Sequence, residues 1–304
     1  MVRLLFSAFF VLVFGVAAIA QERSYLGNAR LFSNDTLGDG QDRWRTGSLA
    51  SSYVWGPDWT GELPSRFGQL LELRISGQVI SPEALVTPNP LDRPYAGALS
   101  AGIHAHFATQ QADISAGVDF VVTGRVTQLD ELQSVIHDVL NVAEPSSAVT
   151  STQIGNGLHP TLVLEAGRDL AVSENVNFRP FVEGRAGIET LARIGADLTF
   201  GQLGQGEFSA RDNVTGHRYR IIRQPWTGFS FVLGADVAHV SDSEFLPSSS
   251  GVTLEQSQTR LRAGVNWQNQ RGASVFYGIT RLSEEFEGQP ESQLLGSVQF
   301  NLKF

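Results

Sequence analysis

The chain has no cysteine, so it contains neither a disulfide bond nor a thiol nucleophile. After residue 20 it also lacks any apolar run of about 18 residues, the length that a membrane-spanning helix requires. Its 22 basic residues are scattered and the formal net charge is −9, which argues against a nucleic-acid partner. These absences exclude a helical membrane protein and a protein held together by disulfide bonds.

Residues 1–20 are the exception to this polar character. Arg3 precedes an apolar run that ends in Ala18-Ile19-Ala20. A charged start, a short apolar run and small residues before a cleavage point are typical of a secretory signal peptide, whereas a membrane anchor would need a longer run. We therefore expect export, cleavage after Ala20, and a single domain comprising residues 21–304.

The rest of the chain alternates between apolar and polar residues. Near the C-terminus, Leu294, Val298 and Phe300 fall on one face of an extended strand and Gln299 on the other, and the chain ends on the aromatic Phe304. A polar inner face and an apolar outer face are typical of a transmembrane β-strand. Similar segments occur near residues 24–33, 43–54, 69–80, 95–108, 112–124, 159–171, 176–188, 190–200, 229–240, 257–269, 272–282 and 293–304.

This even number of segments predicts an all-β fold. We expect a closed antiparallel transmembrane β-barrel of about 12 strands, located as a monomer in the outer membrane of a Gram-negative bacterium. Four connections are long, and we expect them on the extracellular side: 55–68, 81–94, 125–158 and 201–227. Within the third, residues 127–142 have apolar residues at helical spacing and predict a short loop helix. Bulky inward residues such as Arg74 and Arg260 favour a filled interior.

Three polar groups are candidates for chemistry, and each has a simpler structural interpretation. Asn34-Asp35 follows the first strand, where such a pair is often a turn. Residues 92–97 (DRPYAG) open the fourth strand, where a salt-bridged turn with proline is common. Gln133 and His137 are four residues apart and share one face of the predicted helix, which could simply be solvated. Histidine is nevertheless suited to general-base catalysis near neutral pH.

The sequence gives little support for a serine nucleophile or for a zinc site. The chain has no Gly-x-Ser-x-Gly motif, which argues against a serine hydrolase of that type. The remaining histidines show no ligand spacing for zinc, and His104 and His106 have no obvious partner in the sequence. We expect these histidines to be structural: His104, His106, His159, His217 and His239.

A set of short motifs resembles a known family. The motifs are Ser33-Asn34-Asp35, Asp42-x-Trp44-x-x-Gly47, Asp92-Arg93-Pro94-Tyr95-Ala96-Gly97, Gly124, Gln133-x-x-x-His137, Gln153-Ile154-x-Asn156 and Glu285-Phe286-Glu287-Gly288-Gln289. Together they are similar to the outer-membrane lipid A 3-O-deacylase family, and they span most of the chain after residue 20. The DRPYAG and EFEGQ segments are the most specific.

The resemblance implies a calcium-dependent esterase that hydrolyses the 3′-linked acyl ester of lipid A. It assigns catalytic roles to His137, Asn34 and Asp35, with His137 as the general base and Gln133 at the substrate. A hard cation such as calcium prefers oxygen ligands, and the resemblance places it on Asp35 and Asn34. The expected partner is lipid A or lipopolysaccharide in the outer leaflet, bound on the outer wall near the extracellular rim.

The chain departs from the family pattern at two places. Family members often have threonine after the aromatic residue of the second motif, where this chain has Arg45. Thr46 comes one residue later and would face the other side of the strand unless a bulge intervenes. We expect Thr46 and Arg45 at the substrate, with Arg45 binding a phosphate or carboxylate or neutralising Asp42 or Asp35. In addition, the loop at 81–91 has no basic residue, whereas some members carry a lysine there.

Two other functions stay open at this point. The barrel could be a catalytically altered or inactive channel or structural protein, or it could be an outer-membrane phospholipase. Conductance measurements and mass spectrometry of lipids distinguish these alternatives from a lipid A esterase.

Overall fold

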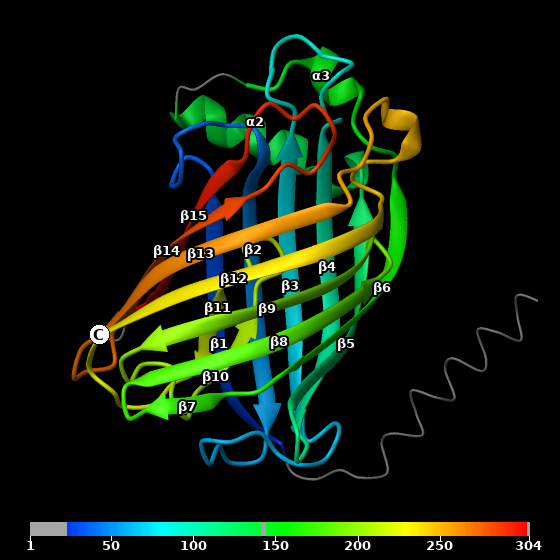
Figure 1. The fold of residues 1–304 in the computed structure, drawn as a ribbon. Coiled ribbons are helices and arrows are strands. Elements are labelled where there is room, and N and C mark those ends of the chain that lie inside the picture. The colour runs from blue at the N-terminus through cyan, green and yellow to red at the C-terminus, as the bar shows by residue number, and fades with distance from the viewer. Residues whose placement is uncertain (1–22, 141–143, 303–304) are drawn as a thin grey trace, which may run out of the picture.

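The structure, a computed structural model, describes residues 23–140 and 144–302; the predicted signal peptide and the terminal Phe304 lie outside this part of the chain. Twelve antiparallel strands form a closed barrel (Figure 1), which confirms the predicted fold class. The wall strands are β1 (Ser24–Asn34), β2 (Trp44–Gly56), β3 (Leu70–Ser81), β4 (Ala96–Ala108), β5 (Asp113–Thr123), β6 (Gly157–Gly167), β8 (Val176–Ala186), β9 (Glu189–Phe200), β12 (Gly228–Ser243), β13 (Ser257–Gln268), β14 (Ser274–Leu282) and β15 (Gln293–Asn301).

Each wall strand pairs with the next wall strand along the chain, and one further pairing, between the first and the last of them, closes the ring. β6 pairs with β8, while β1 pairs with β15. The second of these pairings is short, because it extends only from Phe32↔Val298 to Asn34↔Gly296. We call the end of the barrel where β1 begins and β15 ends the terminal end, and the opposite end the loop end.

The predicted alternation is present in the wall. On β15, Leu294 and Phe300 are 37% and 61% exposed on the outside, whereas Ser297 and Gln299 are buried inside. On β13, Leu261 is half exposed. The apolar outer face therefore belongs to the lipid-facing surface and the polar face to the interior, as expected for a barrel in a membrane.

The long connections lie at both ends, and the expectation that all four share the extracellular side is wrong. β2 ends at Gly56 opposite Ser24, the first residue of β1, so residues 57–69 belong to the terminal end. By the same antiparallel order, residues 201–227 follow the end of β9 at the terminal end. Of the four long connections, only those at 82–95 and 124–156 lie at the loop end. The length of a loop does not indicate the end of the barrel at which it lies, whereas the position of the preceding strand in the antiparallel order does.

The connection at 201–227 folds into a hairpin, β10 (Phe208–Arg211) and β11 (Arg218–Ile222), which lies inside the barrel (Figure 1). Its apolar side packs on the wall, with Tyr219 and Ile221 in one buried cluster with Leu31 of β1 and Val54 of β2. A cavity of about 860 Å³ lies beside the hairpin at the terminal end. The hairpin thus fills much of the interior.

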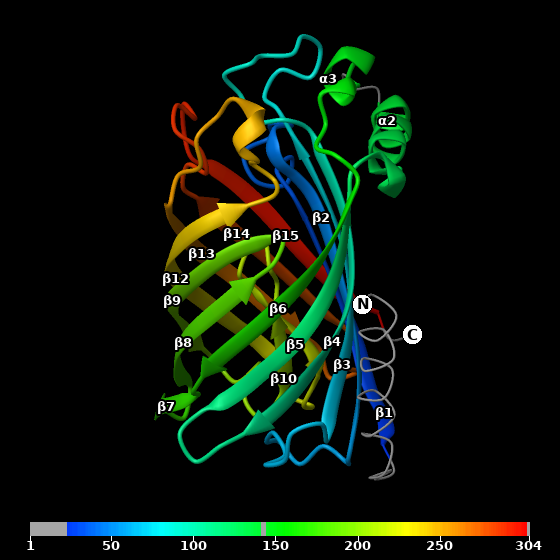
Figure 2. The same cartoon turned by 90° about the vertical axis from the view of Figure 1, so that its right-hand side faces the viewer.

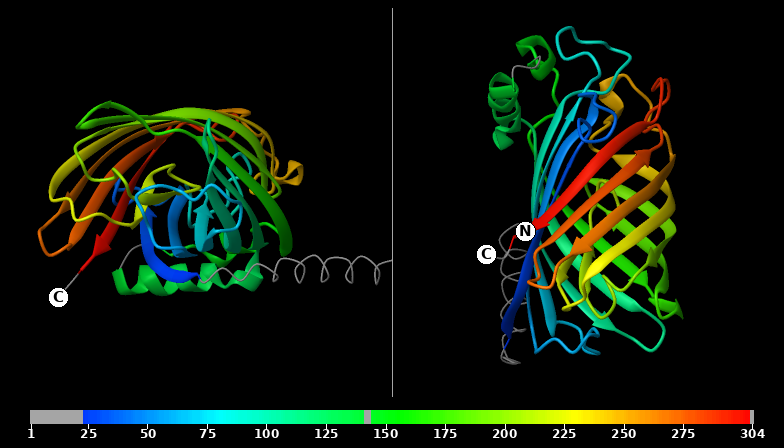
Figure 3. Two further views of the ribbon diagram at one scale, coloured as in Figure 1. Left: turned by 90° about the horizontal axis from the view of Figure 1, so that it is seen from below. Right: turned by 90° about the vertical axis from the view of Figure 1, so that its left-hand side faces the viewer.

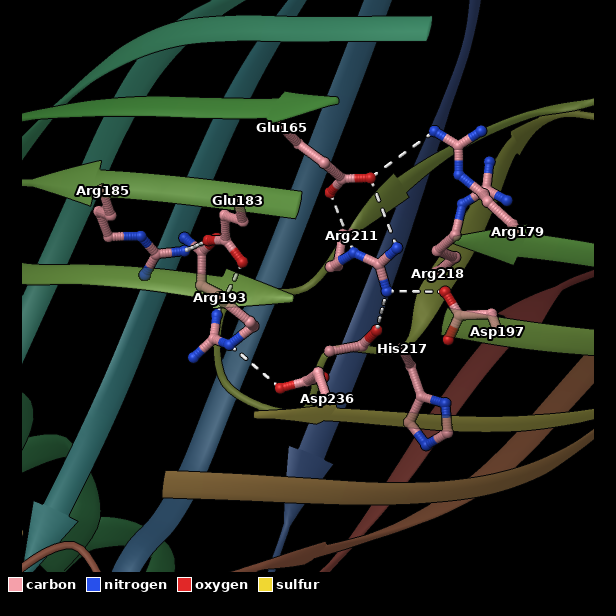
Figure 4. Close-up of polar contacts among 12 residues, drawn as sticks. Glu165, Arg179, Glu183, Arg185, Arg193, Asp197, Arg211, His217, Arg218 and Asp236 are labelled. Carbon is pink, nitrogen blue, oxygen red and sulfur yellow. Dashed lines mark hydrogen bonds and ion pairs between the residues drawn. The ribbon is translucent and has the colours of Figure 1, made fainter. Parts of the chain in front are cut away.

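Paired charges occupy the remaining interior (Figure 4). Arg211 of the hairpin donates to Glu165 at 3.0 Å and to Asp197 at 2.9 Å. Further along the wall, Arg193 bridges Glu183 at 2.7 Å and Asp236 at 3.1 Å. Carboxylates on neighbouring strands are therefore compensated by arginines, which lowers the cost of burying each charge.

Helices are few and short. Helix α2 (Leu129–Leu140) lies within the predicted helical segment 127–142, whose last residues 141 and 142 lie outside the described part, and the turn η2 (Arg125–Thr127) precedes it. Helix α3 (Ser147–Ser151) follows, η3 (Ser248–Ser250) lies between β12 and β13, and the small strand β7 (Leu170–Ser173) pairs with β8. Among the described residues, none of the helices has the length and apolar character needed to cross a membrane.

Candidate active site

The predicted site residues come from two separate parts of the chain that meet at the loop end. Asn34 ends β1, Asp35 follows it directly, and Thr46 lies near the start of β2. Gln133 and His137 lie on α2, which runs along the outside of the wall (Figures 2 and 3) and packs against β3 and β4. The site is therefore located between the rim of the barrel and an external helix.

Several motif residues hold α2 in this position. Gly97 allows η2 and α2 to pack closely against the wall. A Cβ atom at this position would lie 2.8 Å from Thr127 Oγ1 and 3.1 Å from Leu129 Cβ. Asn156 accepts a hydrogen bond from the Val126 backbone at 3.1 Å, and Gln153 donates to Asp130 at 3.1 Å. These residues are scaffold for the helix.

The buried face of α2 presents Gln133 and His137 to the rim. His137 Nε2 lies 3.1 Å from Asp42 Oδ2, and Gln133 Nε2 lies 3.4 Å from the same histidine atom. Tyr95, fully buried just before β4, donates its hydroxyl to Gln133 Oε1 at 2.8 Å. Burial raises the pKa of Tyr95, and the nearby Asp130 and Asp42 raise it further, so its hydroxyl stays a donor at neutral pH.

A β-bulge brings Thr46 into the site. The pairing of β2 with β3 shifts between Trp44 and Gly47, which resolves the one-residue offset noted in the sequence. Thr46 Oγ1 donates to Asp42 Oδ1 and lies 3.4 Å from Asp35 Oδ1. Asn34 donates to the Thr46 carbonyl at 2.7 Å. The structure thus links His137 to Asp35 through Asp42 and Thr46, and we call these residues with Asn34 and Gln133 the rim site.

Asp35 is an unusual carboxyl group within the rim site. Burial raises its pKa from its ordinary value to about 8, and the charges of Asp42 and Asp39 add to the rise. Backbone N–H groups of Arg43 and Thr36, at 2.7 and 2.9 Å, oppose this rise. Although Arg43 lies 3.7 Å from Asp39, Asp35 has no ion pair with a basic side chain among the described residues, and a cation beside it would be favoured.

The fit of this group to calcium is partial. Asp35, Asp42 and the Asn34 side chain supply oxygen atoms, the type of ligand that calcium prefers. However, no group of three or more His, Asp or Glu side chains arranged to hold a metal ion occurs among the residues that the structure describes.

Arg45 does not lie where the sequence-based hypothesis needs it. Its guanidinium is inside the barrel, donating to Glu285 at 2.8 Å and to Glu189 at 2.9 Å, and it stacks over Phe245. It therefore neither neutralises Asp35 nor reaches a head group outside the wall. The physical reason is the bulge, which turns Thr46 toward Asp35 and Arg45 toward the acidic interior.

Glu285 also binds Arg93, so the two most specific motifs meet each other. Although burial opposes the change, Arg45 and Arg93 lower the pKa of Glu285 to about 2. We call Arg45, Arg93, Glu189 and Glu285 the inner network. The EFEGQ and DRPYAG motifs are thus joined inside the barrel at the loop end by the pair of Glu285 and Arg93. Tyr95 and Gly97 of DRPYAG contact η2 and α2 outside the wall.

Two histidines without an obvious partner in the sequence do have one in the fold. His104 pairs with Asp119 at 2.9 Å and His106 with Glu72 at 2.8 Å. These pairs lie inside the barrel. By contrast, the site residues that sequence reasoning missed are Asp42 and Tyr95. Both belong to motifs already noted there, and their presence in those motifs was the available signal.

The fold and the site together define an integral outer-membrane β-barrel with a polar site outside its wall. The family described as "Outer membrane protein LpxR" matches residues 4–304, and the chain belongs to that family. This membership confirms the outer-membrane location.

Solved structures agree with the fold. LpxR from Salmonella typhimurium has a TM-score of 0.71 and 18% identity, covering 91% of this chain and 100% of that one. The KdgM porin (6% identity, 91% and 99% covered) and the NanC porin (7%, 91% and 100%) have TM-scores of only 0.37, too low to bear on function. No curated protein sequence matches the chain.

Proposed function

We propose that this protein is a lipid A deacylase that hydrolyses the 3′-linked acyl ester, including an acyloxyacyl chain, with His137 as general base. The observation that carries the proposal is the connected chain from His137 through Asp42 and Thr46 to Asp35, located outside the wall. A substrate embedded in the leaflet would reach such a site without entering the barrel. This requires the loop end to face outward and both termini to face the periplasm.

Each side chain then has a defined task. His137 takes a proton from the attacking water, and the Asp42 carboxylate, 3.1 Å from Nε2, stabilises the imidazolium that results. Gln133, held by Tyr95, places its amide group against the imidazole ring and so restricts the position of the ring. Thr46 donates its hydroxyl to Asp35, and Asn34 holds Thr46 in place by donating to its carbonyl.

Calcium fits the charge of the rim site, with Asp35 and Asn34 as its proposed ligands. When bound, the ion would polarise the ester carbonyl and stabilise the developing oxyanion. Without a cation, the raised pKa of Asp35 shows that its carboxylate form is disfavoured near neutral pH. A cation held by Asp35 and Asn34 would stabilise that carboxylate form and would supply positive charge for the developing oxyanion.

The test is mass spectrometry of lipid A and phospholipids from cells that express the protein, compared with cells that express His137→Ala. The proposal expects lipid A lacking the 3′-linked acyl chain in the wild type alone. Shortened phospholipids with intact lipid A would instead indicate a phospholipase. No lipid change together with steady conductance in planar bilayers would indicate a channel, although the hairpin inside the barrel argues against one.

A further inference from the structure

Helix α2 has an exposed apolar flank that the rim site does not use. Its buried face carries Leu129, Gln133 and His137 at spacings of four residues. Leu132 is 51% exposed and Val135 61% exposed. At about 100° per residue, Leu132 lies to one side of the buried face and Val135 almost opposite it. The helix thus leaves about half or more of the surface of these two apolar side chains exposed.

The other flank of α2 is acidic and faces away from the wall strands. Asp130 lies on this flank and accepts a hydrogen bond from Gln153, which follows α3. Asp138 lies on it as well and is exposed. Figure 2 shows α3 beyond α2 in the direction of the loop end. The acidic flank therefore faces α3 and the solvent, and Leu132, about 160° around the helix from Asp130, lies on the side away from α3.

This direction leads to the lipid-facing surface of the wall. Figure 3 shows α2 lying crosswise beside the strands when the barrel is seen from below. Leu99 of β4 and Phe120 of β5 point outward near the loop end of that surface and are 41% and 44% exposed. Because α2 packs against β3 and β4, its apolar flank lies beside this band of the wall. An amphipathic helix with one apolar and one acidic side beside a bilayer is arranged to lie in its surface.

We propose that α2 lies in the surface of the outer membrane, with Leu132 immersed among the acyl chains of the leaflet at the loop end and Val135 at the boundary with the lipid head groups. The occupant of the apolar flank is therefore lipid. Immersion fixes the depth of the opposite face, which bears Gln133 and His137. The inference rests on the fold and the exposed flank, and it holds whether or not the protein is a deacylase.

The chain has no cysteine, so single labels can test the depth of each flank. Leu132→Cys and the matched control Asp138→Cys are labelled with an environment-sensitive fluorophore and reconstituted into phospholipid vesicles. Quenching by nitroxide on the acyl chains should be at least about twofold stronger at position 132 than at 138, and quenching by aqueous iodide should show the reverse order. Leu162→Cys on β6, which is 61% exposed on the wall, gives the reference for full lipid contact.

Two outcomes overturn the proposal. Equal quenching of positions 132 and 138 by iodide would show that both flanks lie in water. Protection of position 132 from both quenchers would show that protein, and not lipid, covers the flank. A heat-dependent shift in gel mobility confirms that each variant is a folded barrel before its fluorescence is compared, and Val135→Cys provides a second position at which lipid quenching should exceed that at 138.

Discussion

The rim site and the inner network both contain buried carboxyl groups at the loop end, but the pKa values of these groups shift in opposite directions. Glu285 lies between Arg45 and Arg93, and these arginines lower its pKa to about 2. Asp35 is surrounded by Asp42 and Asp39, and its pKa rises to about 8. Arginine-paired carboxylates stabilise the barrel, whereas a buried carboxyl group such as Asp35, with a raised pKa and no arginine partner among the described residues, is typical of a functional site. Substitutions in the rim site should therefore reduce activity, whereas substitutions in the inner network should reduce the free energy of unfolding.

The largest effect is expected from His137→Ala in the rim site. Loss of a general base reduces the rate about 100- to 10,000-fold, and the barrel should still fold because α2 is held by Gly97, Gln153 and Asn156. Lipid A hydrolysis with purified protein measures the rate. His239→Ala, which removes an exposed histidine outside the site, is the matched control. Near-normal turnover of His137→Ala would remove His137 from the catalytic machinery.

Glu285→Gln in the inner network should reduce stability and leave the activity of the folded protein unchanged. The substitution leaves Arg45 and Arg93 buried without their shared carboxylate, a change that costs about 3–5 kcal/mol when one partner of a buried pair is removed. We expect a lower free energy of unfolding in urea but unchanged activity per folded molecule. Equal stability of the variant and the wild type would mean that Glu189 and water compensate the arginines, and that the contrast between the regions is weaker than the geometry indicates.

Asp42→Asn separates positioning from proton transfer. The amide keeps the shape of the side chain but cannot stabilise the imidazolium of His137, so we expect a loss of at least about tenfold in kcat with a smaller change in KM. An unchanged kcat, or equal losses in kcat and in substrate binding, would limit Asp42 to a structural role.

The high pKa of Asp35 predicts how calcium binding depends on pH. Calcium needs the carboxylate, so its affinity should fall by up to about tenfold for each pH unit below about 8 and level off above it. For the calcium-free protein the sign is opposite: the folded state keeps the proton that the unfolded state loses near pH 4, so stability decreases as pH rises from about 4 to 8.

Calcium titrations of the wild type and Asp35→Asn at several pH values measure this dependence. A pH-independent affinity, or full lipid hydrolysis after exhaustive chelation with EGTA, would contradict calcium binding at Asp35.

The smallest effect on specificity is expected from Arg45→Thr. Because the guanidinium lies inside the barrel with Glu285 and Glu189, the ratio of kcat/KM for phosphorylated and dephosphorylated lipid A should stay the same. Stability should decrease, as in Glu285→Gln. A changed ratio would restore the hypothesis, drawn from the sequence, that Arg45 contacts the head group.

The sequence was a good guide to local features and a poor one to side-chain direction at irregular positions. Alternation predicted the wall strands because each inward or outward position repeats every two residues. At Trp44–Gly47 the bulge breaks this period, so Arg45 and Thr46 lie on sides that counting could not assign. Likewise, the spacing of Gln133 and His137 predicted a shared helix face, but not that Asp42 and Tyr95 would meet it.

By itself, the sequence determined the barrel, its polar interior, the loop helix and the motifs, because these follow from short periods and neighbouring residues. Only the tertiary structure decided that the segment at 201–227 fills the barrel, that EFEGQ pairs with DRPYAG inside it, and that α2 lies outside against the rim. These arrangements join residues far apart in the chain, such as Arg93 with Glu285. Such contacts depend on strand register and loop direction, which the closed ring of hydrogen bonds sets for the molecule as a whole.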